Sequence, residues 1–154
     1  MVRHLRSTSF VTEINALTSS GESSKNLRIL VVEDDETSRE MMAELLHLFG
    51  NHAVDVAETG EDGLEHLRAA TAGDDASSYD LIFTDVGLPG MSGLEMLDEA
   101  VKCGLIHPAN VIVCSAYMVI AREVAARGAQ CIPKPVDAAK IKAAVLARCR
   151  ADAV

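Results

Sequence analysis

Residues 80–93 read DLIFTDVGLPGMSG, and this stretch decides the fold of the chain. Its apolar start belongs to the run Tyr79 to Thr84, which has the length and composition of a buried β-strand. Asp85 follows this run directly, and a turn rich in glycine and proline comes next. Ser92 and Glu95 then have the spacing of a helix capping box. Strand, turn and helix in this order predict one βα unit of a parallel sheet.

The same order of strand and helix repeats on both sides of this stretch. The predicted strands cover residues 27–32, 52–57, 79–84, 110–115 and 130–133, and the predicted helices cover 36–49, 61–70, a segment from 92, 117–127 and 137–150. The repeat predicts an α/β fold, a doubly wound five-stranded parallel sheet in the order 2-1-3-4-5 with helices on both faces. Pro133 has no backbone N–H to donate, which places the last strand at a sheet edge.

The length and composition indicate one soluble domain. Hydrophobic residues make up 49% of the 154 residues and aromatic residues only 3%, so aliphatic side chains must fill the core. Helical spacing places Met41, Met42, Met96 and Val101 among the residues that pack on the sheet. We expect a flexible N-terminal extension over residues 1–26, the folded domain over 27–150, a mobile loop over 71–78 and a short tail over 151–154.

The charge and the distribution of special residues exclude several function classes. A net charge of −9 argues against direct nucleic-acid binding, and no apolar stretch has the length of a membrane span, so we expect a cytoplasmic protein without membrane insertion. The cysteines and histidines have no metal-ligand spacing; we expect reduced, mostly packed thiols and histidines at or near the surface.

Acidic residues follow two strands that the predicted order makes neighbours. Glu33 and Asp34 follow the first strand, and Asp85 follows the third. Like charges about 5 Å apart cost about 3 kcal/mol per pair at an effective dielectric of 20, so such a cluster favours a bound cation. Oxygen ligands without histidine or cysteine favour Mg²⁺. The predicted ligands are Asp34, Asp85 and the Gly87 carbonyl, with Glu33 acting through a water molecule.

The residues at the ends of the other strands complete a site for phosphoryl transfer. A carboxylate beside a cation can attack phosphorus, and we predict that Asp85 is this nucleophile. Of the three phosphoryl oxygens, one is expected to bind Mg²⁺. The Lys134 ammonium, after the fifth strand, is expected to neutralise the second. The Ser115 hydroxyl and the backbone N–H groups near Ala116, after the fourth strand, are expected to bind the third.

These pieces resemble the receiver domain of two-component response regulators, over about residues 27–150. The matching segments are VVEDD after the first strand, DLIFTDVGLPGMSG, Ser115-Ala116 and Lys134-Pro135. The resemblance implies the flavodoxin-like receiver fold, Asp85 as phospho-acceptor, Glu33 and Asp34 as the acid pair, Ser115 as the switch hydroxyl and Lys134 as the phosphate contact. It also implies a cis bond before Pro135.

The family resemblance further implies partners. A sensor histidine kinase or a histidine phosphotransfer protein would donate the phosphoryl group, and a downstream target protein would respond to it. Such a domain is no conventional enzyme, because it catalyses only its own phosphorylation and autodephosphorylation. Cys131 stands where similar proteins carry an aromatic residue, and the segment from Ser115 to Lys134 is short, which implies a trimmed helix or loop there.

Other interpretations of the sequence remain open. The chain is either a free-standing switch, a phosphorelay intermediate, or a receiver detached from a hybrid histidine kinase. A constitutive pseudo-receiver that binds partners without phosphorylation is a further alternative, to which Cys131 lends support. A phosphatase with an aspartyl nucleophile would need a second acid two residues after Asp85, where this chain has Gly87.

Overall fold

A single parallel sheet organises the molecule. The computed structural model describes residue 12, residues 25–73 and residues 78–151 of the chain. Within them, the strands β1 (Arg28–Val32), β2 (Ala53–Ala57), β3 (Leu81–Asp85), β4 (Val111–Ser115) and β5 (Gln130–Pro133) form a five-stranded sheet in the order β2-β1-β3-β4-β5. All neighbouring pairs are parallel, which confirms the predicted topology and the edge position of the last strand.

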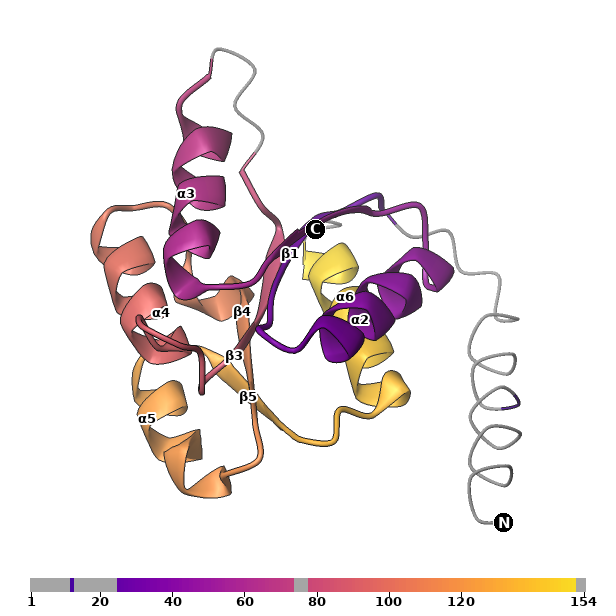
Figure 1. Cartoon of the computed structure of the whole chain (residues 1–154). Helices are drawn as coiled ribbons and strands as arrows, with labels where there is room; N and C mark the ends of the chain where they lie inside the picture. Colours follow the sequence, from indigo (N-terminus) through magenta and orange to yellow (C-terminus); the bar gives the residue numbers. More distant parts are fainter. Residues whose placement is uncertain (1–11, 13–24, 74–77, 152–154) are drawn as a thin grey trace.

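Helices cover both faces of this sheet, as the sequence predicted (Figure 1). One layer contains α3 (Gly60–Thr71), α4 (Gly93–Lys102) and α5 (Ala121–Ala126), and the other contains α2 (Glu36–Leu48) and α6 (Ala138–Ala151). Two short 3-10 turns, η1 (Pro108–Asn110) and η2 (Met118–Ile120), flank β4. The Ser92–Glu95 capping box is present at the start of α4, and the Asp137 side chain accepts a hydrogen bond from the Ala139 N–H at the start of α6.

The core consists of two aliphatic clusters, one on each face. Alternate residues of β1 point to opposite faces, so Leu30 and Val32 pack under α3 and α4 while Ile29 and Val31 pack under α2 and α6. Phe83 of β3 is 1% exposed and is a large side chain at the centre of the second cluster. Burial of this kind contributes about 25 cal/mol per Å² of apolar surface and fixes the strands whose ends carry polar residues.

The helix predicted over residues 117–127 is shorter than expected. Tyr117 leaves β4 in an extended conformation, η2 follows, and α5 has 6 residues. The Tyr117 backbone N–H and carbonyl bind the Ser115 hydroxyl, which holds the chain away from helical geometry at this point. η2 and α5 therefore share the segment that the sequence pattern assigned to one helix.

Three side chains differ from the predicted core. Val101 is 38% exposed, because α4 begins at Gly93 and its 3.6-residue repeat turns Ala100 rather than Val101 toward the sheet. Met41 of α2 is 44% exposed rather than buried against the sheet. His52, expected at or near the surface, is only 4% exposed, because its Nδ1 accepts the Leu27 N–H at 3.0 Å beside β1.

Some predictions fall outside the described part of the chain. The N-terminal extension is described only at residue 12 and from residue 25 on, the central part of the loop over 71–78 is not described, and the tail is described only at Ala151. Among the described residues, no helix combines the length and apolar content that a membrane crossing requires.

Candidate functional site

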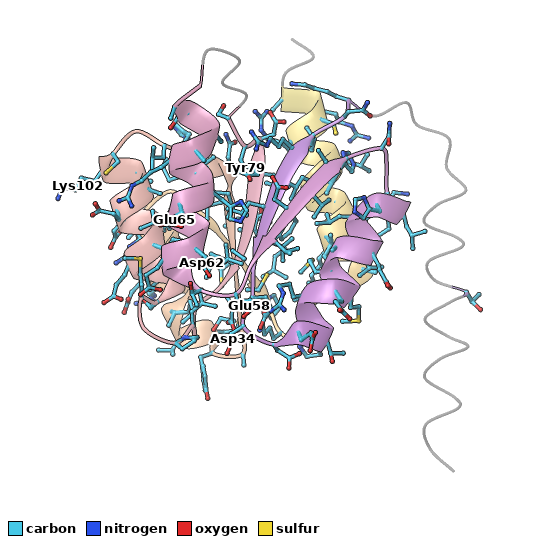
Figure 2. All side chains as sticks on the ribbon, turned by 45° about the horizontal axis from the view of Figure 1, so that its top comes forward. Asp34, Glu58, Asp62, Glu65, Tyr79 and Lys102 are labelled. Atoms are coloured by element: carbon cyan, nitrogen blue, oxygen red, sulfur yellow. The ribbon has the colours of Figure 1, made fainter. Side chains whose placement is uncertain are left out.

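Three carboxylates gather at the carboxyl ends of β1 and β3. These strands are adjacent, with Val32 opposite Thr84, so Glu33 and Asp85 follow paired positions. Glu33, Asp34 and Asp85 each offer an oxygen atom, and these atoms all lie within 4.8 Å of one another. Figure 2 shows Asp34 at the end of the molecule where Glu58 also lies, which is the rim at which β1 and β2 end. The predicted meeting of these acids is therefore observed.

Lys134 is the cation of this rim. It follows β5, and its Nζ lies 3.0 Å from Glu33 Oε2 and 3.1 Å from Asp85 Oδ2. Its backbone N–H donates to the Ser115 carbonyl, and its bond to Pro135 is cis, as expected. Burial acts to lower the pKa of Lys134, but the hydrogen bonds to Glu33 and Asp85 outweigh it, so the pKa lies above 10.5 and the side chain is charged.

Glu33 is the most enclosed member of the acid cluster at 8% exposure. One carboxylate oxygen accepts the Asp35 N–H and the other accepts from Lys134. Burial raises the pKa of Glu33 above its ordinary value, and this effect exceeds the lowering by Lys134 and Asp35. The protein thus holds a carboxylate in an unfavourable environment next to two further acids.

The charges of the rim indicate which ligand it fits. Three carboxylates and one ammonium leave a net negative charge. The side-chain atoms that could bind a metal ion are all carboxylate oxygens, which are hard ligands. These properties match the preference of Mg²⁺, which takes few protein carboxylates and shares its shell with water and phosphate. Asp34 is exposed and Asp85 half-buried, so both carboxylates can be reached from solvent.

The backbone around Asp85 is fixed by a close approach of α4. A Cβ atom at Gly93 would lie 2.0 Å from the Asp85 carbonyl oxygen, so only glycine fits there. The Thr84 hydroxyl donates to the same carbonyl at 3.0 Å, and the Gly87 N–H points to Asp85 Oδ1 at 3.4 Å. The Asp85 side chain therefore leaves the end of β3 in a defined direction.

The hydroxyl of Ser115 is engaged by the backbone of its own loop. It accepts the Tyr117 N–H at 2.9 Å and donates to the Tyr117 carbonyl at 3.2 Å, whereas the neighbouring Ala116 is exposed. Ser115 is joined to the rim through its carbonyl, which binds the Lys134 N–H at 2.8 Å. The structure thus brings Glu33, Asp34, Asp85 and Lys134 together, and it leaves the Ser115 hydroxyl bound within its own loop.

The comparison with protein families decides the assignment. Residues 29–146 match the family model described as the response regulator receiver domain. This chain belongs to that family. It is thus a receiver domain of two-component systems, a signalling domain.

The relatives of this receiver domain include a transcriptional regulatory protein and a two-component system protein. The transcriptional regulatory protein DltR of Streptococcus agalactiae is 38% identical over 82 residues, which cover 53% of this chain and 33% of DltR. Two-component system protein A of Emericella nidulans is 32% identical over 109 residues, covering 70% of this chain and 15% of that protein. The chain therefore spans a third or less of these curated relatives.

A solved structure agrees with the same assignment. The receiver domain of the hybrid histidine kinase CckA is 31% identical, with a TM-score of 0.62, over 79% of this chain and 97% of that one. Few residues of the CckA receiver domain lie outside the match. The match therefore extends over nearly the whole CckA receiver domain.

Sequence reasoning missed two residues that position the receiver site. Arg39 of α2 donates from Nη1 to the Glu33 carbonyl at 2.9 Å and pairs with Glu58 at 3.3 Å, which ties α2 to the rim. In the sequence it is one of many charged helix residues, so no signal marked it. Gly93 has a signal, since it follows the helix cap Ser92 directly.

The residue that replaces the usual aromatic of a receiver domain is packed rather than exposed. Cys131 is half-buried in β5 and contacts the cluster beneath α3 and α4. Burial raises the pKa of its thiol above the ordinary value, so the thiolate is disfavoured. Cys114, also predicted to be a packing residue, is 3% exposed, and burial raises its pKa to about 12. Among the described residues every cysteine is free. Cys103 is exposed, whereas the other three are buried or half-buried, as expected of mostly packed thiols.

Proposed function

We propose that this receiver domain is a phosphorylation-dependent signalling switch with Asp85 as the phospho-acceptor. The observation that carries the proposal is the position of Lys134 Nζ, 3.1 Å from Asp85 Oδ2, opposite two further carboxylates. A nucleophilic carboxylate with a fixed ammonium on one side and an oxygen-rich cation site on the other is suited to phosphoryl transfer.

The donor is a phosphohistidine of a sensor histidine kinase or of a histidine phosphotransfer protein. An Asp85 carboxylate oxygen attacks phosphorus, the P–N bond breaks, and its electron pair stays on the imidazole nitrogen. Lys134 exchanges its contact with the Asp85 carboxylate for a phosphoryl oxygen. Ser115 and the N–H groups near Ala116 bind another, which requires the Ser115 hydroxyl to leave the Tyr117 backbone.

A magnesium ion would be held by Asp34, Asp85 and the Gly87 carbonyl, with Glu33 contributing through water. When bound, Mg²⁺ supplies the positive charge that neutralises the transferring group. The fit rests on the all-oxygen donor set and on the unbalanced negative charge of the rim.

The output is a change in protein contacts. Movement of Ser115 frees the backbone of Tyr117 and alters the surface formed by the segments after β4, which shifts the population of two packings. The protein then binds a downstream target in the cytoplasm, or passes its phosphoryl group on as a relay intermediate, without direct nucleic-acid contact.

Intact-mass spectrometry tests this proposal. The full chain is incubated with acetyl phosphate, with and without Mg²⁺, and the result is compared with Asp85→Asn and with Asp62→Asn, an exposed acid of α3. We expect one added phosphoryl group in the wild type and in Asp62→Asn, dependent on Mg²⁺, and none in Asp85→Asn. An unmodified wild type, or an adduct that persists in Asp85→Asn, refutes the assignment.

A further inference from the structure

A cavity of about 130 Å³ lies beside the acid cluster, on the side of the sheet covered by α2 and α6. Its polar end is formed by Glu33, Asp85 and Lys134. The rest of its wall is mostly apolar and includes Leu45 of α2 and Phe83 of β3, with Ser38 and Thr84 as its two hydroxyl residues. The proposed phosphoryl transfer uses the groups at the polar end, and it assigns no role to the apolar part.

The apolar part of the cavity does not suit water. A buried water needs two to four polar partners, and an apolar cavity of roughly 150 Å³ in an engineered protein stays dry and binds benzene. The cavity here has a similar total volume, which includes its polar end. Lys134, the cation at its polar end, is already paired with both Glu33 and Asp85. A charged molecule would therefore lose its hydration without gaining a free partner.

The entrance is lined by side chains that can adapt. Met41 is 44% exposed and Met42 is half-buried, and both line the cavity from α2. Pro135, which is exposed, and Val136, which is half-buried, line it from the connection between β5 and α6. Methionine side chains are flexible and polarizable, so they open and close over an apolar guest at low cost.

We propose that this cavity is a binding site for a small neutral apolar molecule about the size of a benzene ring. The cavity volume limits the size of the ligand, and the apolar wall favours a ligand without charge. Met41 and Met42 line the entrance through which the ligand would bind. The ring would lie against the aliphatic side chains of α2 and α6 with one edge toward Glu33 and Lys134. This proposal depends on the shape of the folded domain and stands whether or not Asp85 is phosphorylated.

The test uses methionine methyl groups as reporters in NMR spectra of the full chain, labelled at the methionine ε-carbons and titrated with benzene. We expect saturable shifts of the Met41 and Met42 signals, assigned with Met41→Leu and Met42→Leu. The signal of Met96, which is 1% exposed in the cluster on the other face of the sheet, should stay in place. Pyrimidine, a ring of the same size whose nitrogens need hydrogen bonds, should give no saturable shift.

Two variants on the same helix separate cavity binding from surface association. Leu45→Trp fills the cavity with an indole and should abolish the shifts, whereas Leu48→Trp adds the same ring at a position that is 53% exposed and should preserve them. Val31→Leu adds a smaller group to the cavity wall and should weaken the affinity for benzene. It serves as the test variant if Leu45→Trp does not fold. The proposal fails if benzene leaves Met41 and Met42 unchanged, moves Met96 equally, or binds Leu45→Trp and Val31→Leu as it binds the wild type.

Discussion

At the scale of single residues, the site depends on Lys134 and Glu33. Their side chains are 27% and 11% exposed, and their contact of 3.0 Å holds one buried charge against another. Partly buried charges of this kind are costly to leave unpaired, so Glu33 and Asp85 both depend on the Lys134 ammonium. The low exposure of Glu33 explains why its pKa is raised although a lysine lies beside it.

His52 is the residue whose titration should affect stability. It is buried, its Nδ1 accepts the Leu27 N–H, and its Nε2 has no hydrogen-bond partner among the described residues. Burial, and to a lesser extent the charge of His47, lowers its pKa below the ordinary 6.5. The unfolded chain therefore binds the proton more readily than the folded one, and stability is lost as the pH falls below about 6.5.

We expect His52→Asn to reduce this loss. The side-chain oxygen of the asparagine can accept the Leu27 N–H near the position that Nδ1 of His52 occupies. The asparagine does not titrate. The free energy of unfolding in urea, measured from pH 7 to pH 5, should fall more steeply for the wild type than for the variant. Parallel curves would show that His52 is protonated equally in both states.

Some of these residue positions could be predicted from the sequence, and others could not. Glu33, Asp34, Asp85 and Lys134 were predicted to meet because each follows a strand, and neighbouring parallel strands end at one rim. The burial of His52 was not predictable, because it comes from one hydrogen bond to Leu27 across 25 residues. The hydrogen bonds of the Ser115 hydroxyl to the Tyr117 backbone likewise depend on local loop geometry.

At the scale of elements, the contact between α4 and the end of β3 positions the acceptor. The capping box of Ser92 and Glu95 fixes the first turn of α4, and Gly93 lets this turn touch the Asp85 carbonyl. Strand and helix periodicity predicted both elements. The same reasoning overestimated α5, because hydrogen bonds between Ser115 and Tyr117 override the apolar pattern that follows.

Gly93→Ala should be far more damaging than Gly87→Ala. The new Cβ at residue 93 would overlap the Asp85 carbonyl, whereas a Cβ at residue 87 would have no atom within 4 Å. We expect Gly93→Ala to lower the free energy of unfolding by about 1–3 kcal/mol or more and Gly87→Ala by no more than about 0.5 kcal/mol. Urea denaturation measures both, and equal losses would show that α4 does not rest on Asp85.

At the scale of the whole molecule, two core clusters of aliphatic residues hold a rigid sheet, and one rim of this sheet carries a concentration of negative charge. The chain as a whole has a net charge of −9, which adds to the repulsion among the rim acids. A divalent cation at the rim should therefore stabilise the entire fold, since it binds the folded chain and not the unfolded one.

Thermal unfolding at increasing Mg²⁺ concentration should show this linkage. The midpoint of the wild type should rise with Mg²⁺, by an amount equivalent to about 2.7 kcal/mol when the ion is at 100 times its Kd. Asp34→Asn removes a proposed ligand and should reduce the rise strongly, while Asp62→Asn on α3 should not. An identical rise in all three proteins would indicate a nonspecific salt effect.

Chemical trapping of the modified residue tests the role of Asp85 most directly. The chain is phosphorylated with acetyl phosphate and Mg²⁺, reduced with borohydride, which converts an aspartyl phosphate to homoserine, and digested for peptide sequencing by mass spectrometry. We expect homoserine at position 85 and nowhere else. Homoserine at another aspartate, or an unreduced phosphate on a serine, threonine or histidine, would contradict the assignment of Asp85.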